Sequence, residues 1–403
     1  MSTKNASLLT LFCLEGLFLD SILYGDTRIM LRVRSPRRTT RCPRCSTILY
    51  RMHRRASRMV KHMQCDGKLV MVQLTVRDFL CTSCRRVFRE AIPGVDRRRT
   101  TEHYRRFVVP KVHDRSFRSV AIEHSIGAST LVAATRALNT ERGIAWPVGT
   151  FSLGIDEHSF SGTDFVQTIT DVTHHTLLHL LHDTRQTTLR AWIRQIPSEI
   201  RGHITAACID MCQSYRATLG QELPGTPIVI DPFHVIQHLN KELSDVRLIF
   251  TRREYPLPKR LLEKNKEDLT AREKEELQTM FKHYPAIGEL WRIKEIIRRM
   301  YRVKDPKEAG VRYRSVLNGL RGDVRHRFAR LYRTLKNWET EILNYFTHRI
   351  TNGYTEGVHT RIKLLKRISY GFRNKTNYIA KMTLAFLPLA TLVSLAQTST
   401  CLT

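Results

Sequence analysis

The sequence predicts a multidomain α+β protein. We expect an N-terminal zinc-binding module, a helix-turn-helix, and an α/β core interrupted by a large α-helical insertion. Three observations support this prediction: two Cys-x-x-Cys pairs before residue 95, alternating strands from about 151 to 231, and charged helical periodicity from about 234 to 350. The predicted domains are 1–95, 96–148, 149–235, 236–350 and 351–403, the last returning to the core.

The chain is strongly basic, with 67 Lys and Arg against 37 Asp and Glu in 403 residues and a formal net charge of +30. A positive excess spread along a chain predicts a polyanionic partner, most simply nucleic acid. Hydrophobic residues make up 42%, which is enough to bury a core and excludes wholesale disorder. The apolar runs at 8–23 and 382–396 are interrupted by acidic residues or proline, so we predict no membrane span and a cytoplasmic protein.

The first elements are strands. Residues 11–35 alternate around a turn at 24–26 and predict a hairpin, and 69–80 predicts a further strand that ends in the second cysteine pair. Nine cysteines are too few for a disulfide scaffold, and the paired spacing is typical of metal binding in a reducing compartment.

The two pairs are Cys42 with Cys45 and Cys81 with Cys84. Each pair places two thiolates on one side of a tight knuckle, and two knuckles complete a tetrahedral Zn²⁺ site with no open position, so the zinc is predicted to be structural. Rival ligands between the pairs are His53, His62 and Cys65. The nearby Arg41 and Arg44 are predicted to contact DNA phosphates, although a solvated basic face would give the same pattern.

A helix-turn-helix is predicted within the helical stretch 103–142. Ser116 is expected to N-cap a helix to about residue 123, a turn follows around Gly127, and Ser129 is expected to N-cap a second helix at 130–138. The second helix would enter the major groove by its N-terminal residues. An ordinary helical pair would show the same pattern. The residues predicted to contact DNA are Ser129, Thr130 and Arg136.

Carboxylates follow the predicted strands of the core. Those strands are 151–158, 164–171, 175–182, 203–209 and 227–231, with a helix at about 185–196. Asp156 follows a buried run in the first strand, Asp210 ends the fourth, and Glu356 lies on a later helix predicted at 354–368. Three such carboxylates can hold two metal ions beside a phosphodiester, and their oxygens favour Mg²⁺. Each carboxylate taken singly could be structural.

Four motifs in this order carry a resemblance. They are GIDEHSF, CIDMCQSY, DPFHVIQHLN and TNGYTEGVHTRIKLLKRISYGFRN, and together they resemble the DDE transposases of the ISL3 insertion-sequence family. The cysteine pairs and the helix-turn-helix also fit that family's architecture. The resemblance extends from about residue 10 to residue 390.

The resemblance implies an RNase H-like core in which Asp156, Asp210 and Glu356 bind two Mg²⁺ ions, with Mn²⁺ as the alternative metal. The helical segment between Asp231 and Glu356 is then an insertion within that core. Asp231 is a rival member of the triad. His234 could orient a scissile phosphate or cap the next helix, and we rank both as adjacent to the site.

Basic residues follow Glu356 along the same predicted helix and in the GFRNKTN turn after it. We expect them to contact the DNA backbone, although solvated charges would look the same. They are Arg361, Lys363, Lys366, Arg367 and Arg373.

The leading hypothesis is a transposase that binds the terminal inverted repeats of its insertion sequence and catalyses Mg²⁺-dependent strand cleavage and strand transfer. Two ends of double-stranded DNA must be brought together, so we expect at least a homodimer on DNA, associated with the nucleoid. The alternatives are a non-catalytic, zinc-containing DNA-binding regulator and a metal-dependent nuclease without a joining step.

Overall fold

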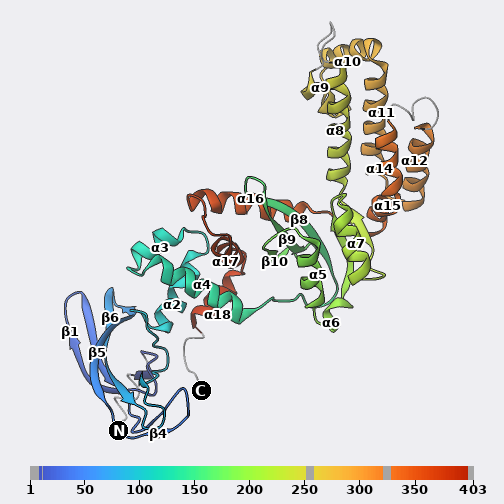
Figure 1. Ribbon diagram of the computed structural model, residues 1–403. Helices are drawn as coiled ribbons and strands as arrows, with labels where there is room; N and C mark the ends of the chain where they lie inside the picture. The colour runs from blue at the N-terminus through green and yellow to red at the C-terminus, as the bar shows by residue number, and fades with distance from the viewer. Residues whose placement is uncertain (1–8, 11, 251–257, 321–327, 398–403) are drawn as a thin grey trace. The chain divides into compact units, whose positions relative to one another are not determined.

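The computed structural model describes residues 9–10, 12–250, 258–320 and 328–397, which form a mixed α+β protein (Figure 1). The chain divides into two compact units. The terminal unit contains the residues up to Gly143 and those from Ile362 onward, and the central unit contains Ile144–Arg361. No helix within the described ranges has the length and apolar character needed to cross a membrane.

The terminal unit begins with a sheet. Its strands are β1 (Phe18–Tyr24), β2 (Arg28–Arg34), β5 (Arg54–Cys65), β6 (Lys68–Leu80) and β7 (Val87–Arg89). The order is β1-β2-β6-β5, with β7 also paired to β6. The antiparallel pairing of β1 with β2 confirms the predicted hairpin, and β6 confirms the strand predicted at 69–80.

The sequence prediction omits β5, the partner of β6. The two strands are joined by Asp66 and Gly67, whose φ values of 49° and 70° are left-handed. A two-residue hairpin turn of this kind requires positive φ at both positions, which is why Asp-Gly is a strong hairpin signal. The signal was therefore present in the sequence.

A group of short helices follows: α2 (Glu102–Val108), η1 (Val109–Val112), α3 (Phe117–Glu123) and α4 (Ala128–Arg142). The predicted N-cap of α3 is confirmed, because the Ser116 hydroxyl accepts a hydrogen bond from the Ser119 amide at 3.1 Å. The predicted N-cap of the second helix is wrong. Gly127 holds that position in extended conformation and its carbonyl accepts from Leu131, so Ser129 lies inside the first turn. The helix also continues four residues past 138.

Two C-terminal helices, α17 (Lys375–Ala385) and α18 (Leu389–Gln397), pack with α2, α3 and α4 and complete their shared hydrophobic core. They lie beside α2 and α4 (Figure 1), and the buried Lys381 ammonium donates to the carbonyls of Val112 and His113. The sequence predicts a single helix at 376–396. It is interrupted before Pro388, because proline has no amide hydrogen to continue a helix.

The central unit contains the five predicted strands, which form one sheet in the order β10-β9-β8-β11-β12. Strands β8, β11 and β12 are parallel, and β9 and β10 are antiparallel to their neighbours. Three helices, the first of them predicted, lie between these strands. The bounds are β8 (Phe151–Ser161), β9 (Asp164–Asp171), β10 (Thr176–Leu181), β11 (Ile204–Ile209), β12 (Ile228–Ile230), α5 (Gln186–Arg194), α6 (Ser198–Arg201) and α7 (Gln213–Glu222).

A long helical segment follows β12, as the sequence predicted. It consists of α8 (Pro232–Phe250), α9 (Lys259–Glu263), η2 (Lys266–Asp268), α10 (Ala271–His283), α11 (Pro285–Met300), α12 (Pro306–Gly319), α14 (Ala329–Asn337) and α15 (Glu339–His348). These helices share one hydrophobic core with the sheet. The Asn344 side chain on α15 donates to the Ile228 carbonyl at 2.8 Å, which attaches the end of the segment to β12.

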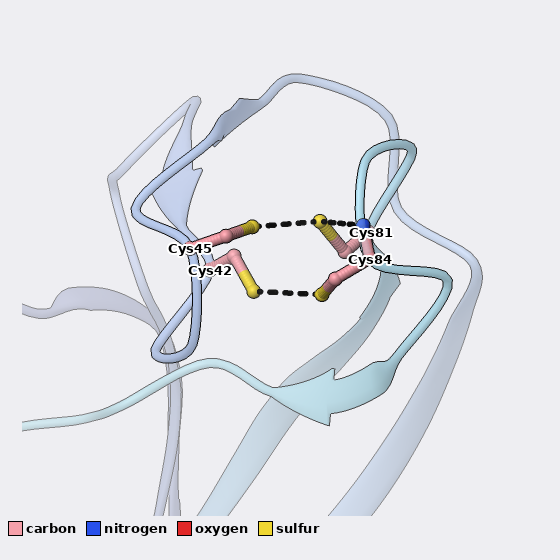
Figure 2. Close-up of side chains that lie close together, drawn as sticks. All are labelled: Cys42, Cys45, Cys81 and Cys84. Carbon is pink, nitrogen blue, oxygen red and sulfur yellow. Dashed lines mark hydrogen bonds between the residues drawn. The ribbon is translucent and has the colours of Figure 1, made fainter.

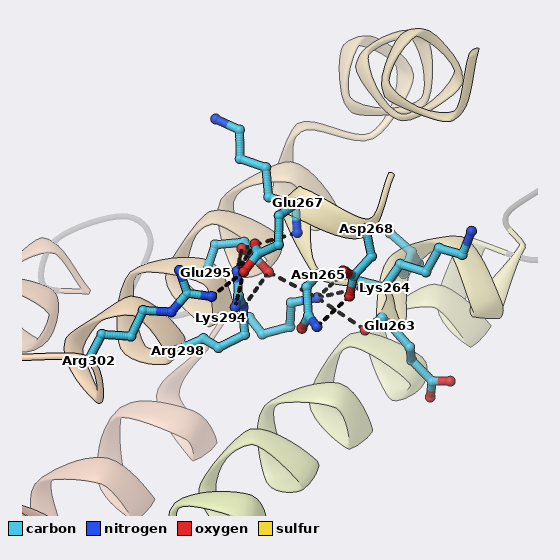
Figure 3. A network of polar contacts seen from close by, with 11 residues as sticks. Glu263, Lys264, Asn265, Glu267, Asp268, Lys294, Glu295, Arg298 and Arg302 are labelled. Atoms are coloured by element: carbon cyan, nitrogen blue, oxygen red, sulfur yellow. Dashed lines mark hydrogen bonds and ion pairs between the residues drawn. The ribbon is translucent and has the colours of Figure 1, made fainter. Parts of the chain in front are cut away.

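A buried polar network fixes α9 on α11 (Figure 3). The Lys294 ammonium, fully buried, donates to the carbonyls of Leu262 at 2.9 Å and Lys264 at 2.8 Å. Glu295 accepts from Arg298 at 2.7 Å and lies 3.4 Å from Lys294. Carbonyls at the end of α9 that would otherwise be unsatisfied are thus paired, as buried backbone groups require.

Helix α16 (Gly353–Ile368) closes the central unit and carries the chain into the terminal unit. It confirms the helix predicted at 354–368, and its first turn lies at the candidate site.

Candidate functional site

The register of the three parallel strands places three aspartates in one row. Gly154 pairs with Cys208, so Asp156 and Asp210 lie equally far beyond that pair. Ile209 pairs with Ile230, so Asp231 follows β12 beside Asp210. The carboxyl ends of β11 and β12 meet at this edge, which is where α/β sheets commonly form their sites.

Asp156, Asp210 and His234 form a cluster that could hold a metal ion. One carboxylate oxygen of each aspartate and one ring nitrogen of His234 all lie within 4.8 Å of one another. His234 belongs to the first turn of α8, directly after β12. The structure therefore brings together two predicted triad residues and a histidine that the sequence ranked as adjacent to the site, whereas Glu356 is outside this group.

Burial makes the cluster unfavourable for negative charge. It raises the pKa of Asp156 to about 7, with the neighbouring Asp210 as the second cause, and it also raises the pKa of Asp210. Within the described ranges, no lysine or arginine forms an ion pair with either aspartate, and Oδ1 of Asp210 is buried without a hydrogen-bond partner. A divalent cation would supply the missing positive charge, so the donor set fits such an ion.

Asp231 has its carboxylate committed to the backbone. One oxygen accepts from the Phe233 amide at 2.7 Å, which caps α8, and the other accepts from the Asn352 amide just before α16. Asp231 is 3% exposed. Its geometry is that of a residue that fixes the starts of two helices at the site.

Glu356 lies half-buried in the first turn of α16. That turn is held on the sheet, because the Asn352 side chain donates to the Ile155 carbonyl at 3.3 Å and the hydroxyls of Thr355 and Thr170 are 2.7 Å apart. Burial, with Asp231 as the second cause, raises the pKa of Glu356. The first turn of α16, which carries Glu356, is therefore fixed on the sheet close enough for the Asp231 charge to act on Glu356.

Two buried histidines beside Asp156 were missed in the sequence. The Nδ1 atom of His359 lies 3.6 Å from Asp156 Oδ2, while its Nε2 atom is 2.9 Å from the Thr168 hydroxyl. His158 is 3.0 Å from the same hydroxyl, and the two rings are 4.7 Å apart. Strand alternation could have identified His158, since it shares a face with Asp156. Nothing in the sequence pairs His359 with Asp156.

Strand alternation does correctly separate Asp156 from its neighbour. Glu157 is exposed, and it accepts a hydrogen bond from the Tyr215 hydroxyl at 3.1 Å. It points to the opposite face from Asp156, because successive side chains along a strand alternate between the two faces of the sheet.

Gly154 allows α16 to approach β8, and we predict that Gly154→Ala is destabilising. A Cβ there would meet Thr170 Oγ1 at 2.6 Å, Val172 Cγ1 at 2.6 Å and Thr355 Oγ1 at 2.7 Å. We expect a loss of roughly 1–3 kcal/mol in the free energy of unfolding. The matched control is Gly220→Ala in α7, where a Cβ would meet nothing within 4 Å. This substitution should raise the free energy of unfolding by about 0.5–1 kcal/mol, because alanine is favoured over glycine inside a helix. Urea unfolding of both variants measures this, and equal effects would contradict it.

The four paired cysteines come together in the terminal unit. Their sulfur atoms point toward one another (Figure 2), with Sγ–Sγ distances of 3.6 Å for Cys42 and Cys84 and 3.4 Å for Cys45 and Cys81. A tetrahedral Zn²⁺ with bonds of about 2.3 Å requires sulfurs roughly 3.8 Å apart. The donor set and spacing fit a structural zinc ion.

The two knuckles have the same backbone geometry. The amide of each first cysteine, Cys42 or Cys81, donates to the carbonyl five residues on, at 2.9 Å in both. Ser46 and Arg85, which follow the second cysteines, have φ values of 60° and 55°. A hydrogen bond from the Thr47 hydroxyl, the largest cause, lowers the pKa of Cys45 to about 6, which favours the thiolate that binds metal.

The rival zinc ligands lie outside this cluster. His53, His62 and Cys65 are not among the described residues whose side chains group with the four cysteines. His62 is fully buried elsewhere, where Nε2 bonds to the Phe12 carbonyl and Nδ1 lies 2.9 Å from the Thr101 hydroxyl. It is a core residue that ties the N-terminal strands to the segment before α2.

His62 should make stability depend on pH. Burial lowers the pKa of His62 from its ordinary 6.5 to about 4, so the unfolded chain binds the proton first as pH falls. The stability that neutral His62 contributes is fully present above about pH 6.5 and is lost as pH falls toward 4. The loss amounts to roughly 3 kcal/mol in the free energy of unfolding. Unfolding of His62→Gln at pH 7 and pH 4.5 should show a flatter dependence than wild type. The exposed His53→Gln should match wild type, and an unchanged slope in His62→Gln would contradict the assignment.

The residues predicted to contact DNA are largely at the surface. Thr130 and Lys366 are half-buried. The exposed ones are Arg41, Arg44, Ser129, Arg136, Arg361, Lys363, Arg367 and Arg373. A groove of about 700 Å³ lies between α3, the start of α4 and residues 369–377, and both Arg118 and Arg373 line it. Cationic side chains thus border the predicted helix-turn-helix.

Comparison with known proteins links these features to one activity. A family model for ISL3-type DDE transposases, described as "Transposase", matches residues 153–382. The transposase for insertion sequence element IS1001 of Bordetella parapertussis is 21% identical over 359 residues, which cover 86% of this chain and 88% of that protein. The transposase for insertion sequence element IS1557 of Mycobacterium tuberculosis is 26% identical over 271 residues, which cover 59% of this chain and 60% of that protein. The region matched by the family model contains Asp156, Asp210, His234 and Glu356.

Proposed function

The chain belongs to the ISL3 family of DDE transposases, enzymes that act on DNA, and from this premise we propose that Asp156, Asp210 and Glu356 are its catalytic triad. The observation that carries the proposal is the row of carboxylates on parallel strands, where Asp156 is buried, Asp210 is half-buried, and neither forms an ion pair with a lysine or arginine of the described chain. Glu356 would complete the site from the first turn of α16. This triad would hold two divalent cations, Mg²⁺ or Mn²⁺.

The strand order β10-β9-β8-β11-β12 has two antiparallel pairings followed by two parallel pairings, and this arrangement supports an RNase H-like core. The helices from 232 to 348 would then be an insertion between the second and third carboxylates. We assign residues 1–95 to the zinc-binding module, 96–148 to the helix-turn-helix, 149–235 and 351–403 to the core, and 236–350 to the insertion. Helices α17 and α18 also complete the hydrophobic core of the helix-turn-helix.

The reaction conserves phosphodiester bonds in its joining step. Water attacks the phosphorus at the element's end, a P–O bond forms, and the P–O3′ bond breaks to leave a 3′-hydroxyl on the element and a 5′-phosphate on the flank. That hydroxyl then attacks a target phosphodiester, whose own P–O3′ bond breaks. Divalent cations held by Asp156, Asp210 and Glu356 would supply Lewis-acid stabilisation of the charge that develops on the phosphate.

The protein's residues set the geometry for these steps. Asp156 and Asp210 present carboxylates from a rigid sheet, and Asp231 fixes the starts of α8 and α16 through backbone amides. His359, held by Thr168, orients the Asp156 carboxylate. Sites built on strands and helix starts hold such groups more firmly than loops do.

Recognition of the terminal inverted repeats is assigned to the terminal unit. The zinc module, with Arg41 and Arg44, and the helix-turn-helix, with Ser129, Thr130 and Arg136, would contact double-stranded DNA. The basic residues of α16 and the turn after it would contact phosphates. Two ends must be joined to one target, so the active form on the nucleoid would be at least a dimer.

A strand-transfer assay tests this function. Purified protein is mixed with a labelled duplex that carries an end of the element and with supercoiled plasmid, in Mg²⁺ or Mn²⁺. We expect nicking at the element's 3′ end followed by covalent joining to the plasmid. Cleavage without joining would identify a nuclease, and end-specific binding without cleavage in either metal would identify a DNA-binding regulator.

A further inference from the structure

We propose that His234 is a direct ligand of a divalent cation, together with Asp156 and Asp210, and that it gives the site a preference for Mn²⁺ over Mg²⁺. This inference rests on the proposed function and adds a nitrogen ligand to an otherwise all-oxygen triad. The support comes from the positions of the donor atoms, the lack of hydrogen-bond partners for two of them, and the way in which α8 begins.

The first support is proximity. A His234 ring nitrogen and one oxygen from each aspartate are all within 4.8 Å of one another, so one ion placed between them can contact all three. Glu356 is outside this group. His234 is therefore the third protein ligand available to an ion bound between Asp156 and Asp210. The three residues come from β8, the end of β11 and the first turn of α8, which share one core.

The second support is that the polar atoms are unpaired. Nε2 of His234 and Oδ1 of Asp210 are both buried, and within the described chain neither has a hydrogen-bond partner. Leaving such an atom unpaired costs about 1–3 kcal/mol, and an unfilled ion site is one of the few reasons for it in a native protein. A bound cation would satisfy both atoms together.

The third support is how the histidine is held. The Asp231 carboxylate accepts from the Phe233 amide, and the Asp231 carbonyl accepts from the His234 amide at 3.1 Å. The Phe233 ring lies edge-on to the imidazole, with centroids 5.7 Å apart. The backbone that carries His234 is therefore fixed at the strand end, as metal sites require of their ligands.

Ligand chemistry then predicts the metal preference. Mg²⁺ takes oxygen ligands and retains water. Mn²⁺ also binds oxygen ligands, but as the first member of the divalent transition-metal series it accepts an imidazole nitrogen more readily than Mg²⁺ does. Two carboxylates and one imidazole should therefore bind Mn²⁺ more tightly than Mg²⁺. Mutation of a residue that only supports a metal ligand typically weakens binding about ten- to hundredfold, so removal of the imidazole itself should weaken Mn²⁺ binding at least about tenfold and should change Mg²⁺ binding much less.

The test measures metal binding on the full-length protein with its zinc site loaded. Mn²⁺ is titrated and followed by electron paramagnetic resonance, and pulsed measurements detect the coupling of a directly bound histidine nitrogen. The variants are His234→Ala, Asp210→Asn and His359→Ala. The matched control is His238→Ala, one turn further along α8, where the ring is near Glu242 instead. Thermal melts verify that each variant is folded.

We expect wild type and His238→Ala to show the nitrogen coupling, and His234→Ala to lose both the coupling and the Mn²⁺ preference. Unchanged coupling and affinity in His234→Ala, with loss in Asp210→Asn, would overturn the histidine assignment and leave the proposed active site standing. Loss of the nitrogen coupling in His359→Ala but not in His234→Ala would show that His359 is the bound histidine. That result would also overturn the assignment of His234. Mn²⁺ binding that none of these variants alters would contradict the proposed active site itself.

Discussion

Asp156→Asn should abolish metal-dependent cleavage of element ends, with a loss of about 10³-fold or more, and should leave end binding intact. The substitution removes the charge of one of the two carboxylates that we propose to bind metal, and a loss of this size corresponds to several kcal/mol of transition-state stabilisation. Cleavage of a labelled end in Mg²⁺ and in Mn²⁺ measures the first effect, and gel-shift affinity for the same duplex measures the second.

The neighbouring Glu157→Gln is the matched control, because its side chain lies on the opposite face and contacts Tyr215. Stability provides a further check. Burial raises the pKa of Asp156 from its ordinary 3.8 to about 7, so the metal-free fold loses stability as pH rises from about 4 to 7, and the loss is complete above pH 7. Asp156→Asn should therefore melt at the same or a higher temperature without metal at pH 8. Persistent cleavage in this folded variant would remove Asp156 from the site.

Cys42→Ser should release zinc and destabilise the N-terminal sheet. One zinc ion per chain is expected in wild type, and its loss leaves three thiols around an incomplete site. Structural zinc contributes a large part of the folding free energy of such modules, so a cost of at least about 3 kcal/mol and a marked loss of end binding are expected. Elemental analysis and melting with and without chelator measure both effects.

Cys65→Ser is the control for this change, since Cys65 is half-buried at the end of β5 and outside the cysteine cluster. It should retain one zinc ion and wild-type affinity for DNA. Full zinc content in Cys42→Ser would instead mean that one of the rival residues completes the site. Zinc absent from the wild-type protein would contradict the zinc assignment.

The strands and the cysteine knuckles were readable from the sequence because their signals are local. Alternation of buried and exposed side chains gave all five strands of the central sheet, and the two Cys-x-x-Cys spacings gave the four residues that come together. Asp156 and Asp210 follow from the same pattern, because a parallel register aligns residues that end neighbouring strands. The Asp66-Gly67 hairpin was equally local and was overlooked.

The rest depends on contacts between distant residues. His234 approaches Asp156 only because β12 lies two strands from β8, and His359 does so only because α16 lies over Gly154. The periodicity of the sequence does not predict either contact, because the residues come from elements far apart in the chain. The start of α4 was misplaced for another reason. Ser129 is a favoured N-cap residue, but the buried Ile126 fixes the preceding turn and Gly127 takes the capping position.

The packing of α17 and α18 against α2 and α4 affects the order in which the protein folds as it leaves the ribosome. Leu384, Leu387 and Leu392 belong to the same core as Val108 and Leu131, yet they are translated after the whole central unit. The helices that we propose to recognise DNA therefore gain their full packing only when synthesis is nearly finished. A chain terminated early by a nonsense codon would lack α17 and α18 and the packing they provide. We therefore expect such a shortened chain to bind the ends of the element poorly and not to compete with the complete enzyme.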